Sequence, residues 1–350
     1  MSTAFIYNDI FRNSNYGQKH PVTVNRVTNV YDLSKILGFE NKVDYFYNEI
    51  ASDEQLCTFH NKDYINILKL TEQSQCINKE DSLKYNLGTF SNPIFKEMFR
   101  RHASAAGALL LATKLIKSKY NYIFSPGSGA HHARQNKASG FCYINDIAIC
   151  IKRLKTEGYT KILYYDMDAH YGDGVVEYFR KDTQVMTISI HQHNLWPRNK
   201  KFEFNKDYKI VNIPLREKFS DKNFISLVEE DFFYPNIIKF DPEVILMQMG
   251  ADCLKEDKFS DLNLSNNSMM YIIKKMKDLN SKIIVMGGGG YNPWVILRAW
   301  IYNLATLSDN ENLITLNESA KQFIKKIKWK EKPKDIWLNT IKDEPNIFVR

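Results

Sequence analysis

The 350-residue sequence has few cysteines and no long run of apolar residues. Its apolar stretches are short and interrupted, so no membrane-spanning helix is expected. The N-terminal sequence MSTAFIYNDIFRN lacks a basic segment followed by a long apolar one, so we expect no secretory signal. The cysteines are odd in number and show no C-x-x-C spacing, which argues against a disulfide framework or a structural zinc cluster. We therefore expect a cytoplasmic protein.

The charge is mildly basic, with 48 Lys and Arg against 40 Asp and Glu and a net charge of +8. A nucleic-acid binder would cluster its basic residues beside aromatic ones or contain a recognisable module. The nearest candidate is KQFIKKIKWKEKPK (321–334), which we interpret as the solvated face of a C-terminal helix. We therefore expect no nucleic-acid and no membrane partner.

Five short apolar runs follow one another from residue 120 onward, and helical segments separate most of them. They are YNYIFS (120–125), KILYYDMD (161–168), VMTISIH (185–191), EVILMQMG (243–250) and KIIVM (282–286). This alternation is typical of parallel βαβ units, and continuous apolarity indicates strands buried on both faces. We find no repeat or linker, so we expect one domain over residues 1–310 with an extension packed on it over residues 311–350.

The segment DMDAHYGDG (166–174) follows one of these runs and presents candidate metal ligands. Asp166, Asp168 and His170 lie at every second position, which places them on one face of an extended chain. Close carboxylates repel each other unless a cation or a proton lies between them. The alternative is a strand end with solvated polar residues, but the added imidazole favours a divalent metal.

A third ligand is expected from another strand end, and Asp252 is the best candidate. Three protein ligands leave a position open for water and a substrate oxygen, as a catalytic metal requires. Cys253 is a less favoured ligand, because it would point the other way on a continuing strand. One nitrogen and two oxygens suit zinc, and iron(II) would also be accepted.

Adjacent histidines, His131 and His132, follow the glycine-rich loop PGSG. Two imidazoles in one polar site could supply a general base and a general acid, because histidine titrates near neutral pH. A catalytic imidazole usually needs a carboxylate to hold its tautomer, and Asp166 and Asp173 remain available for this purpose.

Glycines flank two further candidate residues. Gly172 and Gly174 are expected to break the strand, with Asp173 between them in the turn. Tyr291 follows the run Gly287–Gly290. Such a run could hold a phosphate through backbone N–H groups, or the tyrosine hydroxyl could donate to a developing oxyanion.

Together these motifs resemble the zinc-dependent histone deacetylase family. The likeness rests on GSGAHHARQNKASGFCYINDIAI, DMDAHYGDGVVEYF, GADCLKED with LNLSNN, and GGGGYNPW, and it spans the chain from Tyr16 to about Trp300. The sequence is most similar to bacterial acetoin-utilisation-type deacetylases. The resemblance implies an α/β fold of three αβα layers, with a mostly parallel and roughly eight-stranded sheet like that of the arginases. It also implies removal of an acetyl or short acyl group from acyl-lysine in proteins, or from acetylpolyamines or other small acylated amines.

The resemblance also implies roles for matching residues. Zinc would be held by Asp168, His170 and Asp252. His131 and His132 would form the base and acid pair, supported by Asp166 and Asp173 respectively, and Tyr291 would stabilise the tetrahedral oxyanion. The substrate channel would be lined by Gly140, Phe141 and Trp196, with Phe259 and Ser91 near its rim. A structural potassium ion would be bound by Asp166, Asp168, His170, Ser189 and Ile190, partly through backbone oxygens.

The sequence departs from the family pattern at several positions. Ser91 replaces an Asp that grips the substrate backbone in many relatives, Trp196 replaces a common Phe, and Tyr171 stands where His is frequent. Phe259 occupies a rim position that is acidic in polyamine-selective relatives. An apolar group there gives a cationic amine no partner, so we rank acyl-lysine above acetylpolyamine.

Two other functions remain as alternatives. A dinuclear manganese ureohydrolase related to arginase would need another carboxylate after Asp252, where Cys253 and Leu254 stand instead. A catalytically silent binding protein would be favoured by loss of a ligand, a histidine or the tyrosine, and all of these are present. The physiological substrate and the oligomeric state stay open.

Overall fold

The computed structural model describes residues 2–17, 19–22, 25–198, 201–207 and 209–344. In this part of the chain nine strands form one sheet, in the order β2-β1-β3-β9-β8-β4-β5-β7-β6, and only the β6–β7 pair is antiparallel. The strands are β1 (Thr3–Tyr7), β2 (Asp44–Tyr47), β3 (Tyr122–Ser125), β4 (Ile162–Met167), β5 (Val185–Gln192), β6 (Glu203–Asn205), β7 (Ile210–Leu215), β8 (Val244–Met249) and β9 (Lys282–Met286). The expected mostly parallel, roughly eight-stranded sheet is therefore confirmed.

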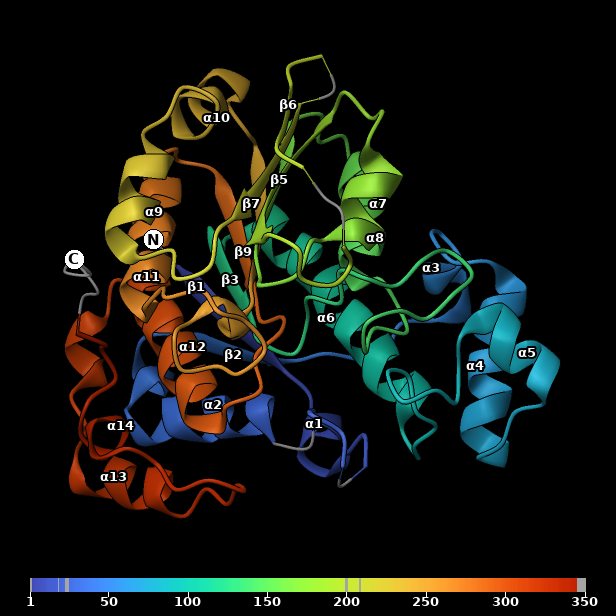
Figure 1. The fold of residues 1–350 in the computed structure, drawn as a ribbon, viewed down its shortest axis with the longest axis horizontal. Coiled ribbons are helices and arrows are strands. Elements are labelled where there is room, and N and C mark those ends of the chain that lie inside the picture. Colours follow the sequence, from blue (N-terminus) through green and yellow to red (C-terminus); the bar gives the residue numbers. More distant parts are fainter. Residues whose placement is uncertain (1, 18, 23–24, 199–200, 208, 345–350) are drawn as a thin grey trace.

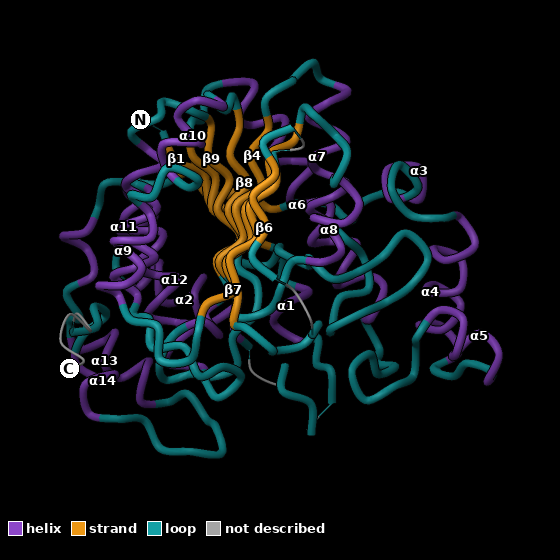
Figure 2. Tube along the Cα trace, turned by 45° about the horizontal axis from the view of Figure 1, so that its top comes forward, coloured by secondary structure: helices purple, strands orange, loops and turns teal. Residues whose placement is uncertain are grey.

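Helices cover both faces of the sheet and complete the three expected layers (Figures 1 and 2). On one side lie α2 (Arg26–Ile36), α9 (Asp221–Val228), α10 (Tyr234–Phe240), α11 (Asn266–Lys277), α12 (Pro293–Leu307), α13 (Glu318–Lys325) and α14 (Asp335–Asn339). The other side carries α4 (Lys62–Ser74), α5 (Lys79–Tyr85), α6 (Met98–Ser118), α7 (Asp146–Thr156) and α8 (Asp173–Phe179). Shorter helices are α1 (Ile10–Asn13) and α3 (Asp53–Leu56), with the 3-10 helices η1 (Phe39–Asn41), η2 (Ala251–Cys253) and η3 (Glu311–Ile314).

The five apolar runs of the sequence form the strands β3, β4, β5, β8 and β9. Nearly all of their residues are buried, as continuous apolarity predicts for strands covered on both faces. All five strands are parallel, so their carboxyl ends meet at one edge of the sheet. In open parallel sheets this edge carries the functional site.

The structure corrects the expected path of the chain after β4. The strand ends at Met167, so Asp168 and His170 lie in a bend beyond it rather than on the strand. Asp173 is not in a turn either, because it begins α8. Gly172 does not end the strand. A glycine is needed there because a Cβ atom would lie 2.0 Å from Asp166 Oδ2.

The C-terminal segment packs on the helices α2 and α12. Helix α13 ends at Lys325, so the expectation of a helix over the basic segment 321–334 is wrong beyond that residue. The buried Arg298 of α12 donates hydrogen bonds to the carbonyls of Thr340 (2.7 Å) and Lys342 (2.9 Å), and its Nη1 lies 2.7 Å from Asp343 Oδ1. Among the described residues, none of the helices combines the length and apolar character needed to span a bilayer.

Candidate active site

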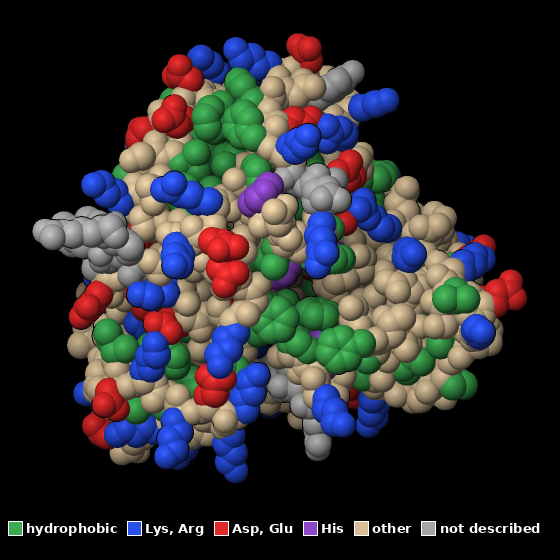
Figure 3. Space-filling model, in the orientation of Figure 1, with side chains coloured by type: hydrophobic (Ala, Val, Ile, Leu, Met, Phe, Trp, Pro, Cys, Tyr) green, Lys and Arg blue, Asp and Glu red, His purple; other side chains and the backbone are tan. Residues whose placement is uncertain are grey.

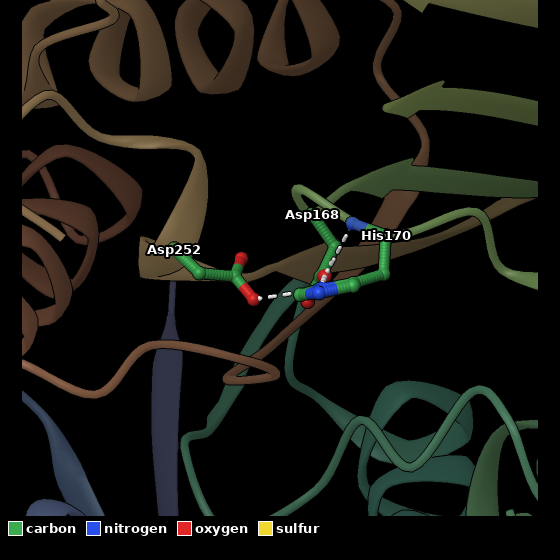
Figure 4. A group of neighbouring side chains, drawn as sticks. All are labelled: Asp168, His170 and Asp252. Atoms are coloured by element: carbon green, nitrogen blue, oxygen red, sulfur yellow. Dashed lines mark hydrogen bonds and ion pairs between the residues drawn. The ribbon is translucent and has the colours of Figure 1, made fainter. Parts of the chain in front are cut away.

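Two carboxylates and an imidazole meet at the carboxyl edge of the sheet. Asp168 and His170 come from the bend after β4, and Asp252 comes from η2 after β8. One ligand atom from each lies within 4.8 Å of the others. Nδ1 of His170 is 3.1 Å from both Asp168 Oδ1 and Asp252 Oδ2, and both carboxylates point toward the imidazole ring (Figure 4). Within the described residues, this is the one such group that could hold a metal ion.

The electrostatics of this group favour a cation. Burial, followed by the neighbouring Asp168 carboxylate, raises the pKa of Asp252 to about 6. Both aspartates are almost inaccessible to solvent. Two buried carboxylates in contact with the same imidazole therefore repel each other, and a divalent ion between them would remove that repulsion.

Glycines make room for the carboxylates at this edge. A Cβ atom on Gly250 would lie 2.2 Å from Asp168 Oδ2, and one on Gly289 would lie 2.1 Å from Asp252 Oδ2. The carboxylates are also oriented by donors, because Gln248 Nε2 (2.8 Å) and the Gly289 N–H (2.9 Å) both bind Asp168 Oδ2. One nitrogen, two oxygens and this close packing fit a zinc ion.

The His131 imidazole lies beside the metal group and is held by a carboxylate. Its Nδ1 is 2.8 Å from Asp166 Oδ2, which also accepts a 2.5 Å bond from the Tyr164 hydroxyl. Its Nε2 is 3.9 Å from Asp168 Oδ1. Burial alone would lower the pKa of His131, but the carboxylates of Asp166 and Asp168 outweigh it and raise the pKa to about 9.

The His132 imidazole has its own carboxylate partner and a different charge environment. Its Nδ1 is 2.7 Å from Asp173 Oδ1, and Arg134 donates a 2.6 Å bond to Asp173 Oδ2. Burial, and next the charge of His131, lower the pKa of His132 to about 4. The two imidazole rings are 3.8 Å apart. The pKa of one imidazole is thus raised and that of the other is lowered, as an acid and a base require.

A pocket of about 80 Å³ lies beside the metal group, and Gly140, Phe141 and Tyr291 are among the residues that line it. The Trp196 ring is 4.6 Å from the His132 ring. A Cβ on Gly140 would lie 2.5 Å from His132 and 2.6 Å from Trp196, so only glycine fits there. The Phe141 ring lies 5.9 Å from the Tyr291 ring. Phe141, which follows Gly140 in the chain, has a left-handed φ of 68°, and its N–H donates a hydrogen bond to Asn92 Oδ1.

Phe259 and Tyr291 stand together at the rim, with their ring centroids 3.9 Å apart. Buried Asp257 holds both residues by accepting hydrogen bonds from the N–H groups of Tyr291 (2.6 Å) and Phe259 (3.1 Å). Ser91 is exposed on the loop before Asn92, and its backbone contacts the His20 ring. Gly140, Phe141, Trp196 and Phe259 thus lie close to the histidine pair or to Tyr291, whereas Ser91 lies on an exposed loop.

The residues expected to bind potassium also lie close together. Asp166 and Ser189 face each other across the β4–β5 pair, next to Met167 and Ile190. Oδ1 of Asp166 is buried and makes no hydrogen bond among the described residues. An oxygen atom in this state suits a hard cation.

Several supporting residues were not predicted from the sequence. Arg26 donates to the carbonyls of Gly288 (3.0 Å) and Gly290 (2.7 Å), which fixes the loop before Tyr291. Asp146 accepts from the N–H groups of Gly129 (2.9 Å) and Ala130 (2.8 Å), just before the histidine pair. The Arg26 contacts join parts of the chain 262 and 264 positions apart, so no local motif signals them. Asp146 lies 17 and 16 positions from its partners, within the motif GSGAHHARQNKASGFCYINDIAI, but its spacing alone did not reveal its role.

Comparisons with known proteins agree with this geometry. Residues 20–307 match the histone deacetylase domain family. The chain is 32% identical to Type-1 histone deacetylase 1 of Dictyostelium discoideum over 88% of its own length, and it spans only 63% of that protein. It is 29% identical to Histone deacetylase 1 of Homo sapiens, over 91% of this chain and 67% of that one.

Solved structures show the same relationship. The crystal structure of an HDAC homologue from Aquifex aeolicus superposes with a TM-score of 0.90 and 32% identity, over 99% of this chain and 95% of that one. An HDAC homologue complexed with SAHA gives a TM-score of 0.89 and 33% identity, over the same shares of the two chains. The specific likeness to acetoin-utilisation-type deacetylases stays a prediction. The chain belongs to the histone deacetylase family.

Proposed function

We propose that the protein is a zinc-dependent amidohydrolase that removes an acetyl or short acyl group from the side-chain amine of acyl-lysine in proteins. The observation that supports this most directly is the group of Asp168, His170 and Asp252 beside a buried histidine pair that lines the same pocket. Iron(II) would fit the same ligands. We further propose a catalytic domain over residues 1–310, an extension over residues 311–350, and a cytoplasmic location.

In this proposal each side chain has a defined task. When bound, zinc supplies a Lewis acid that polarises the acyl carbonyl and lowers the pKa of water. The histidine pair removes a proton from the attacking water and delivers one to the leaving amine, and Asp166 and Asp173 hold the two tautomers. Tyr291 donates a hydrogen bond to the oxyanion, because burial raises the pKa of its hydroxyl and keeps it protonated.

We also propose a structural potassium ion at Asp166, Asp168, His170, Ser189 and Ile190. The buried, unpartnered Oδ1 of Asp166 supports this site. The ion would offset the carboxylate charge beneath the histidine pair without taking part in bond breaking.

A second candidate function is deacetylation of acetylpolyamines or other small acylated amines. The rim position next to Tyr291 carries the apolar Phe259, which offers a cationic amine no partner. We therefore rank acyl-lysine first. For a ureohydrolase the buried Cys253 and Leu254 provide no second bridging carboxylate, and a silent binding protein would not need both histidine–carboxylate pairs.

Replacing Tyr291 with Phe tests the catalytic assignment. Loss of an oxyanion donor should lower kcat by about 10²-fold or more. Turnover of an acetyl-lysine peptide and of an acetylpolyamine by the zinc-loaded protein should be measured side by side. Zinc content and thermal melting of Tyr291→Phe should match those of the unaltered protein, and near-unchanged turnover would remove Tyr291 from the mechanism.

A further inference from the structure

A groove of about 730 Å³ opens beside the mouth of the channel, and lysines dominate its charge. Phe259 and Tyr291 form part of its wall, so the groove is continuous with the catalytic rim. Its described lining residues include no Asp or Glu. Five of them are lysines: Lys19, Lys258, Lys326, Lys328 and Lys330. Figure 3 shows the hollow on this face, where hydrophobic and histidine side chains meet, with Lys and Arg side chains between it and the lower edge of the molecule.

The lysines of the C-terminal segment are held in place by the packing of their neighbours. Lys326, Lys328 and Lys330 are exposed, whereas the alternating Ile327 and Trp329 are partly buried and pack on the hydrophobic core. Trp329 stacks edge-on against Trp294 of α12 at 5.8 Å. The lysines therefore project from a packed segment rather than from a loose tail.

Most of this positive charge has no counter-ion. Lys258 lies 2.5 Å from Glu331 and is neutralised by it, and Lys334 is likewise paired with Glu256 at 2.6 Å. Within the parts of the chain that the structure describes, Lys19 and the three lysines of the C-terminal segment form no ion pair. Segment 321–334 contains seven lysines and one glutamate, so its sequence already carries this excess.

We propose, on the basis of the deacetylase function proposed above, that the lysine groove selects acyl-lysine substrates whose neighbouring residues are acidic. Like charges facing each other across an interface are repelled, and opposite charges speed up the encounter. A basic protein tail or a cationic acetylpolyamine would meet four uncompensated ammonium groups at the channel mouth. An acidic segment on either side of the acyl-lysine would instead pair with them.

The geometry favours a peptide over a nucleic acid as the occupant. Phe259 and Tyr291 line the groove, and Tyr291 also lines the pocket that contains Asp168 and His170. A substrate peptide is anchored at this end by its own acyl-lysine. A nucleic acid would be bound by the lysines alone and would block the channel.

Peptides of equal length test the proposal. Each carries a central acetyl-lysine flanked by Asp and Glu, by Ser and Gly, or by Arg and Lys, and kcat/KM is measured with the zinc-loaded full chain. The acidic peptide should exceed the basic one at least about 10-fold at low salt. The ratio should fall toward 1 in ~0.5 M salt, where the Debye length is roughly 4 Å.

The charge-reversed variant K326E/K328E/K330E should reverse or abolish this preference. The matched control K114E/K117E/K239E makes the same change in charge on exposed lysines at the opposite edge of the sheet. The control should retain the full preference and the activity of the unaltered protein. An equal or better rate with the basic peptide would overturn the proposal, as would a preference unchanged in K326E/K328E/K330E.

A binding measurement separates this proposal from the deacetylase function. The dissociation constants of fluorescent versions of the same peptides can be measured by anisotropy with Tyr291→Phe. If no peptide is hydrolysed by the unaltered protein, the deacetylase function fails, while the ratio of dissociation constants still decides the charge preference. Tight binding of a short DNA duplex that is lost in K326E/K328E/K330E, without a preference among the peptides, would identify a nucleic-acid site instead.

Discussion

A methyl group at position 289 would have no room beside the carboxylates of the metal group. The Cβ of Gly289→Ala would lie 2.1 Å from Asp252 Oδ2 and 2.8 Å from Asp168 Oδ2. Because both carboxylates are buried, they must turn away from His170 to avoid it. We expect zinc affinity to fall about 10- to 100-fold, the scale for disturbing the orientation of metal ligands.

Zinc content per chain after dialysis against a graded chelator measures this effect. Gly158→Ala is the matched control, since a Cβ at Gly158 meets no atom within 4 Å although its φ of 98° disfavours alanine. It should lose a little stability and no zinc affinity. Equal zinc affinity in Gly289→Ala and the unaltered protein would show that the glycine is not needed for the ligand geometry.

The residues of the candidate site could be singled out from the sequence because each lies in a short motif, and the structure brings them close together. Asp166, Asp168 and His170 follow a strand, and His131 and His132 follow a glycine-rich loop. The path between them could not be predicted, because the bend after Met167 depends on contacts with β8 and the glycine loop. The side chains that orient them act over long sequence separations.

At the scale of elements, burial decides which strands the sequence reveals. The strands β3, β4, β5, β8 and β9 are buried on both faces, so each is a continuous apolar run. β2 (Asp44–Tyr47) lies at the edge of the sheet with exposed ends, and β7 contains Asn212 and Pro214. The sequences of β2 and β7 cannot be distinguished from those of loops, which is why these strands were not predicted.

Arg298 of α12 ties the C-terminal segment to the rest of the fold. Replacing it with Met leaves the carbonyls of Thr340 and Lys342 and the Asp343 carboxylate without their donor. Hydrogen bonds from a charged donor typically contribute about 1.5–3 kcal/mol each. Because Asp343 is partly exposed and can be hydrated, we expect a total loss of about 3 kcal/mol in the free energy of unfolding.

Denaturant unfolding measures this loss, and limited trypsin digestion locates it. Segment 326–344 should be cut faster in Arg298→Met, while the sheet stays protected. The control Lys161→Met removes an exposed pair with Asp241 and should change stability by less than about 0.5 kcal/mol. Equal digestion of both variants would mean that the segment is held by other contacts.

At the scale of the whole molecule, the metal group joins the ends of β4 and β8 at the centre of the sheet. A zinc ion that binds the folded chain and not the unfolded one should stabilise the fold by about 4 kcal/mol at a free concentration 1,000 times the dissociation constant. For a chain of this size, the melting temperature should rise by roughly 5–10 °C. Scanning calorimetry with and without a chelator measures this shift.

The variant Asp252→Asn separates the effect of zinc on the melting temperature from the effect of the Asp252 charge. The amide keeps the shape of the side chain but removes the buried charge that repels Asp168, so the zinc-free variant should melt at the same temperature as the zinc-free unaltered protein or higher. Added zinc should then produce little or no shift, because one of the ligands is lost. A lower melting temperature of the zinc-free variant would contradict this expectation. It would show that Asp252 stabilises the zinc-free fold through its hydrogen bonds with the Ala169 N–H (3.0 Å) and His170.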